Sequence, residues 1–83
     1  MRYLIMCRSL TYAQRSQRLL EKGGISAGVV KAPTGLSGSG CSYCVSVSGK
    51  NGARAIDLLS DEGMLRGKVY IQDADGSVRE VVT

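Results

Sequence analysis

The chain has 83 residues, a net charge of +4 and hydrophobic residues at 43% of its positions, with neither Phe nor Trp. This length supplies one small core but not two, so we expect a single domain over residues 1–83 with a core of aliphatic side chains. The early apolar run Tyr3–Cys7 is far shorter than the ~20 residues of a membrane span, and no signal-peptide cleavage pattern follows Arg2. Three cysteines, an odd number, favour reduced thiols in a cytoplasmic protein, and the modest charge does not favour a nucleic-acid partner.

The first part of the chain predicts a strand, a helix and a second strand. Residues 2–7 form an apolar run whose length favours a buried strand. Ser9 or Thr11 is expected to cap a helix whose apolar residues recur at helical spacing, and Gly23-Gly24 is expected to end it. Residues 25–32 then predict a strand that stops at the following proline, which cannot donate a ladder hydrogen bond.

A loop rich in glycine and serine, residues 33–40, leads into the third predicted strand, residues 41–48. Along that strand Tyr43, Val45 and Val47 point to one face, while the intervening residues, including Cys44, point to the other. The alternation predicts a half-buried strand with Cys44 on its polar face.

The last part of the chain predicts a second helix and a hairpin. Asn51 is expected to cap the helix and Gly63 to end it. Residues 68–72 and 77–82 are expected to form two strands that turn at Asp75-Gly76, which is a strong hairpin signal.

This order of elements indicates an α+β fold. It matches the ferredoxin-like β-α-β-β-α-β pattern, an antiparallel sheet with two helices on one face, here with an extra C-terminal hairpin strand. In the spatial strand order 4-1-3-2 of that fold, the end of the first strand lies beside the start of the third. We therefore expect Cys7 to neighbour Cys41 and Cys44.

Cys41 and Cys44 form a C-x-x-C pair, a spacing used by metal sites, iron–sulfur clusters and dithiol redox centres. A single chain lacks the four Cys or His ligands of a closed zinc site, so metal binding would need two chains that share their pairs. A strand rather than a helix follows the pair, which weakens a thioredoxin-type interpretation. Cys7 is more simply explained as a small buried hydrophobic residue.

The loop before the pair contains Ser37, Gly38, Ser39 and Gly40, whose backbone amides are candidates to stabilise a thiolate or another anion. The two serines have no histidine to act as a base, so a serine-hydrolase function is excluded. Arg15, Arg18 and Lys22 form a basic stripe on the first helix, which is most simply a solvated face.

Several of these residues resemble the bacterial family of selenium/sulfur carrier-like proteins. The resemblance rests on Cys7-Arg8-Ser9 with Ala13, on Gly24-Ile25, and above all on Pro33-x-x-Leu36-Ser37-x-x-Gly40-Cys41-x-Tyr43-Cys44. It implies a ferredoxin-like domain in which Cys41 holds sulfur or selenium as a persulfide or perselenide. The chain departs from the family pattern at Thr34 and Ser42.

The leading hypothesis is therefore a thiol-based carrier or accessory protein, without a cofactor and not a self-sufficient enzyme. Cys41 would accept the chalcogen, Cys44 would be the resolving thiol, and other proteins would be its transfer partners. One alternative is a metal or iron–sulfur module formed by the C-x-x-C pairs of a homodimer. Another is a plain interaction domain that uses the sheet face with Cys44, Ser46 and Tyr70.

Overall fold

The computed structural model describes residues 1–7, 9–31, 43–65 and 68–81. Its elements are β1 (Arg2–Met6), α1 (Leu10–Lys22), β2 (Ala27–Lys31), β3 (Tyr43–Ser48), the short 3-10 turn η1 (Gly49–Asn51), α2 (Gly52–Asp61), β4 (Val69–Gln72) and β5 (Val78–Val81). The predicted strands and helices are all present within one or two residues of their expected ends where the chain is described. The stretch 32–42, which carries the predicted glycine-rich loop and Cys41, lies outside the described residues.

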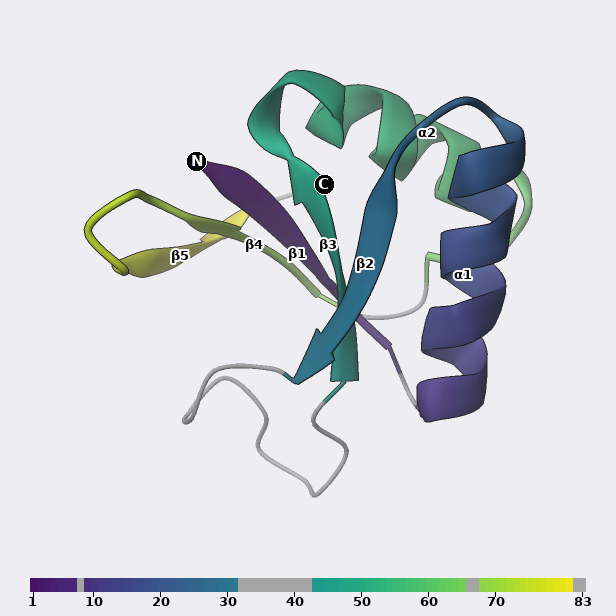
Figure 1. Ribbon diagram of the computed structural model, residues 1–83, viewed down its shortest axis with the longest axis horizontal. Coiled ribbons are helices and arrows are strands. Elements are labelled where there is room, and N and C mark those ends of the chain that lie inside the picture. Colours follow the sequence, from purple (N-terminus) through teal and green to yellow (C-terminus); the bar gives the residue numbers. More distant parts are fainter. Residues whose placement is uncertain (8, 32–42, 66–67, 82–83) are drawn as a thin grey trace.

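The five strands form one antiparallel sheet in the order β2-β3-β1-β4-β5. The first four strands reproduce the expected 4-1-3-2 order, and β5 extends the sheet beyond β4 as a hairpin partner. α1 packs on β2, β3 and α2, so the two helices share one face of the sheet, while the β4–β5 hairpin projects away from α1 (Figure 1). The α+β fold class is confirmed.

The strand alternation divides the side chains between the two faces as the sequence predicts. Val45 and Val47 are buried in the core against the helices, together with residues such as Ile5, Leu20 and Leu59. Tyr43 packs at the edge of the same core. Leu4 and Cys44 lie on the opposite, open face, yet both are completely buried. The sheet face that no described helix covers therefore also carries buried side chains.

Glycines in the left-handed conformation end both helices. After α1, Gly24 has φ +83° and the Ile25 N–H donates to the Leu20 carbonyl. After α2, Gly63 has φ +68° and the Met64 N–H donates to the Leu59 carbonyl. This is the Schellman arrangement, in which residues past the helix satisfy its last free carbonyls.

The caps at the helix starts differ from each other. Ser9 caps α1 with its hydroxyl, which accepts a hydrogen bond of 3.3 Å from the Tyr12 N–H, and Thr11 lies inside the helix instead. Asn51 precedes α2, but the prediction of a side-chain cap there is wrong because its side chain makes no capping hydrogen bond. The reason is that Asn51 is the last residue of η1, with φ −106° and ψ 0°, and not the extended residue that a side-chain cap requires.

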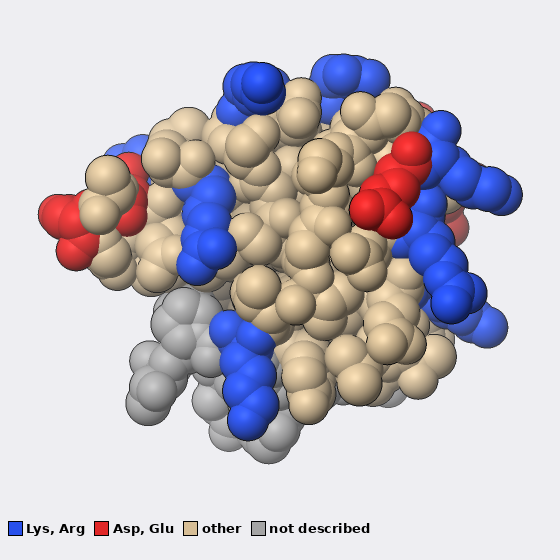
Figure 2. All heavy atoms as spheres, in the orientation of Figure 1, with Lys and Arg blue, Asp and Glu red and all other residues tan. Residues whose placement is uncertain are grey.

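Charged side chains of both signs lie on the face shown in Figure 2. Basic side chains gather over α1, at the right in Figure 2, where Arg15, Arg18 and Lys22 are exposed as predicted. Acidic side chains lie at the opposite end, over the β4–β5 hairpin, which carries Asp73 and Asp75, and also beside the basic side chains at the right. Across the described ranges, no helix is both long and apolar enough to cross a membrane.

Candidate thiol site

Cys44 is the second residue of β3 and is held by strands on both sides. It lies opposite Met6 on β1 and Val30 on β2. These neighbours are on the open face with it, and the Cys44 side chain has no exposed surface. Because β3 pairs with β1 on one side and with β2 on the other, the backbone of Cys44 is held more firmly than it would be in a loop.

The ionisation of Cys44 follows from this burial. The pKa of its thiol is raised to about 11, mainly by desolvation and also by the neighbouring Cys7, while Arg2 acts to lower it. The charged thiolate is disfavoured because a buried sulfur loses its hydration without gaining an equivalent partner. At neutral pH Cys44 is thus a protonated thiol and a poor nucleophile in the folded conformation.

Cys7 follows directly after β1, beside the start of β3, as the predicted strand order requires. Its backbone N–H donates to the Tyr43 carbonyl at 3.1 Å, and its thiol donates to the Ile5 carbonyl with a sulfur–oxygen distance of 3.6 Å. Its side chain is half-buried and packs against the core on the helix side. The fold thus brings the backbones of Cys7 and Cys44 together, while Cys7 packs toward the helices and Cys44 lies on the open face.

Arg2 is a residue of this region that sequence reasoning missed. Its Nε donates to Gln72 Oε1 at 2.8 Å on β4, and its Nη1 donates to Ser46 Oγ at 3.3 Å on β3. The guanidinium therefore spans β1 on the open face, on the same side as Leu4 and Cys44. The sequence could have placed Arg2 on the open face, because Arg2 and Leu4 are two residues apart on one strand and residues two apart share a face.

Cys41 and the predicted anion-binding residues Ser37, Gly38, Ser39 and Gly40 lie outside the described residues. The sulfur–sulfur separation of the C-x-x-C pair and the amides of that loop thus remain predictions. Within the described ranges, no three Cys, Asp or Glu side chains are grouped so that they could hold a metal ion.

The fold is a single-sheet α+β domain with a buried cysteine near the start of β3, and the sequence has a second cysteine three residues earlier. These features define a class of small thiol-bearing proteins. A family model described as "Putative Se/S carrier protein-like" matches residues 2–71. The chain belongs to this family, as its cysteine motif suggested. No curated protein and no solved structure gives a significant match.

Proposed function

We propose that this protein carries sulfur or selenium on Cys41, with Cys44 as the resolving thiol. The observation that carries the proposal is membership of the family over residues 2–71, combined with the C-x-x-C spacing of Cys41 and Cys44 in the sequence. The burial of Cys44 supports a division of labour between the two cysteines. A thiol that receives sulfur must meet a donor protein, and the buried Cys44 cannot do so in the folded conformation.

Loading is a simple exchange of sulfur between thiols. The Cys41 thiolate attacks the terminal sulfur of a donor persulfide, a Cys41 S–S bond forms, and the donor S–S bond breaks to release the donor as a thiolate. Selenium loads by the same displacement from a donor perselenide. No net oxidation occurs, because the transferred atom keeps its oxidation state.

Release uses the second thiol. Cys44 loses its proton to solvent and attacks the Cys41 sulfur, which forms a Cys41–Cys44 disulfide and expels hydrosulfide or hydroselenide. The chalcogen is reduced by two electrons, which the two cysteine thiols supply, and a cellular dithiol then reduces the disulfide. In a straight strand the Cα atoms of residues three apart are ~10 Å apart, beyond the ~7 Å that a disulfide spans, so the proposed disulfide requires a turn at Cys41.

Burial gives Cys44 a useful property in this scheme. While it is protonated and covered, it does not attack the loaded Cys41, so the cargo is retained. Opening of the first residues of β3 would expose the thiol, return its pKa toward the ordinary value and start release. The first residues of a strand lie at the end of the sheet, where local opening costs less than at its centre.

Intact-mass measurement tests the proposal. The reduced protein is incubated with a cysteine desulfurase and cysteine, or with a small-molecule perselenide. The expected result is one added sulfur or selenium atom in the wild type and in Cys7→Ser, a longer-lived adduct in Cys44→Ser, and none in Cys41→Ser. An adduct that persists in Cys41→Ser, or its absence from the wild type, would refute the proposal.

The same sample distinguishes the metal alternative. Stoichiometric iron or zinc in anaerobically purified protein, lost together in Cys41→Ser and Cys44→Ser, would favour a cluster shared by two chains over a carrier.

A further inference from the structure

Arg2 carries an uncompensated positive charge on the open sheet face. Both side chains that it contacts are neutral, because its Nε donates to Gln72 Oε1 at 2.8 Å and its Nη1 donates to Ser46 Oγ at 3.3 Å. Within the described ranges Arg2 meets no carboxylate, and the salt bridge found there joins Lys68 to Glu80. A guanidinium stays protonated at physiological pH. The two hydrogen bonds therefore hold this cation in place without cancelling its charge.

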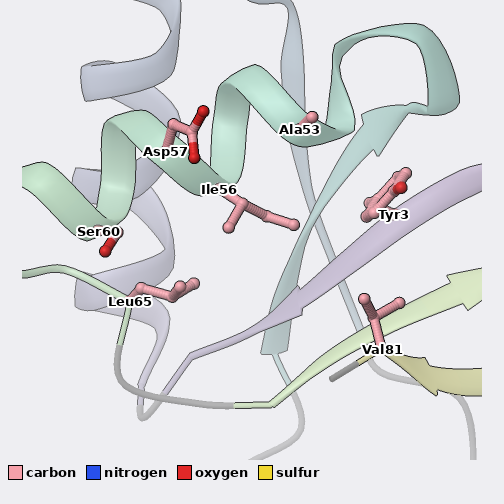
Figure 3. A pocket seen from close by; sticks show the side chains of 7 residues that line it. All are labelled: Tyr3, Ala53, Ile56, Asp57, Ser60, Leu65 and Val81. Carbon is pink, nitrogen blue, oxygen red and sulfur yellow. The ribbon is translucent and has the colours of Figure 1, made fainter. Parts of the chain in front are cut away.

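The strand pattern places the charge on the side of the sheet that holds Cys44. Figure 3 shows Tyr3 on the helix side of β1, where it lines a pocket beneath α2, so its neighbour Arg2 points to the other face. Ser46, which accepts from Arg2, lies two residues after Cys44 on β3 and shares its face. Residues two apart on a strand are ~7 Å apart, which is shorter than the ~10 Å Debye length at 0.1 M salt. The cation thus acts on the thiol without being screened out.

The other titratable groups around this thiol do not supply a free positive charge. Desolvation raises the thiol pKa most, Cys7 raises it as well, and Arg2 is the group that acts in the opposite direction. On the open face Lys68 is paired with Glu80 at 3.5 Å, and Tyr70 on β4 is uncharged at neutral pH. The charged residue of β2, Lys31, lies on the helix side by the strand alternation.

Arg2 is anchored on a part of the sheet that does not have to open for release. Release exposes Tyr43 and Cys44 at the start of β3, whereas Arg2 is held by Ser46, farther along β3, and by Gln72 on β4. We propose that Arg2 stabilises the Cys44 thiolate as it forms and so sets how fast the loaded protein releases its sulfur or selenium. This inference rests on the proposed carrier function and assigns Arg2 to its release step.

The chemistry of release explains why a fixed cation matters. The Cys44 S–H bond breaks, its proton goes to solvent, and the thiolate attacks the Cys41 sulfur. The Cys41–Cys44 S–S bond forms, and the bond from Cys41 to the terminal sulfur breaks, so that hydrosulfide leaves with the bonding electron pair. Negative charge therefore gathers first on the Cys44 sulfur. A cation that is already in position stabilises this charge without reorganisation of the surrounding groups.

The test follows the release of labelled hydrosulfide from loaded protein over a range of pH in the wild type, Arg2→Met and Arg79→Met. Chains are compared only after intact mass shows one added sulfur. Arg79→Met is the matched control, because it removes an equal charge from the helix side of β5, the side to which Val81 points in Figure 3. The pH profile of Arg2→Met should be displaced to higher pH, with release up to about fivefold slower at neutral pH, the factor for one exposed charge pair. Arg79→Met should follow the wild type.

Two further variants separate the charge of Arg2 from its hydrogen bonds. Arg2→Lys keeps the charge and should keep most of the wild-type profile. Gln72→Leu keeps the cation but removes its anchor on β4, so the profile should be displaced in the same direction by a smaller amount. A change in how readily β3 opens would instead alter the release rate by one factor at every pH, without displacing the profile.

The outcomes distinguish the role of Arg2 from the carrier function itself. A wild type that takes up no sulfur or selenium overturns the carrier function, and the role of Arg2 falls with it. If the wild type loads, an undisplaced profile in Arg2→Met, or an equal displacement in Arg79→Met, overturns the role of Arg2 and leaves the carrier function standing. A rate that changes by the same factor at every pH in Arg2→Met also overturns it, and would identify Arg2 as a purely structural residue.

Discussion

The buried thiol of Cys44 makes stability depend on pH in the alkaline range. Its pKa is raised from an ordinary 9.0 to about 11 by desolvation in the folded chain. The folded state therefore holds this proton more tightly than the unfolded state. The contribution of Cys44 to the free energy of unfolding should be constant below pH 9, fall between pH 9 and 11, and level off above. Two pKa units correspond to about 3 kcal/mol, an order-of-magnitude figure.

Urea unfolding at a series of pH values measures this effect, in a reducing buffer and followed by far-ultraviolet circular dichroism because the chain has no Trp. Cys44→Ala should lose about 1 kcal/mol at neutral pH, close to the value of one buried methylene, and should lack the alkaline decline that Cys44 causes. Cys7→Ala is the matched control and should keep most of the decline. An equal alkaline decline in the wild type and in Cys44→Ala would show that Cys44 is not a buried neutral thiol.

Two further predictions concern packing around β1. In Gly52→Ala the new methyl group would run into the Tyr3 ring, so the free energy of unfolding should fall by about 1 to 3 kcal/mol. Gly28→Ala is the control, because its methyl group meets open space, and it should change the free energy of unfolding by less than about 0.5 kcal/mol. Equal effects of the two changes in chemical denaturation would contradict the close contact between Gly52 and Tyr3. In Arg2→Met the pKa of Cys44 should rise further, because Arg2 lowers it in the wild type. Alkylation of Cys44 in the folded protein at pH 9 should therefore slow. Faster alkylation would instead show that Arg2 acts mainly by covering the thiol.

Much of the fold was predictable because its signals are local. The alternation in β3 placed Val45 and Val47 in the core, and Gly24 and Gly63 marked the ends of the helices. Strand order followed from the sequence of elements, since few connections satisfy the handedness and pairing rules. These features depend on residues close together in the chain.

The features that sequence reasoning missed depend on distant residues. A cysteine on an open face is expected to be exposed, but Cys44 is completely buried, at a position paired with Met6 and Val30 on two other strands. The role of Arg2 depends on Gln72, seventy positions away.

The proposed division between Cys41 and Cys44 is tested most directly by a chase of the loaded protein. The protein is loaded with isotopically labelled sulfur, separated from the donor, and incubated without reductant at a pH and temperature that open β3. The account predicts one equivalent of labelled hydrosulfide for each Cys41–Cys44 disulfide formed, with the label retained in Cys44→Ser. Release of the label at the same rate in Cys44→Ser, or without formation of the disulfide, would contradict it.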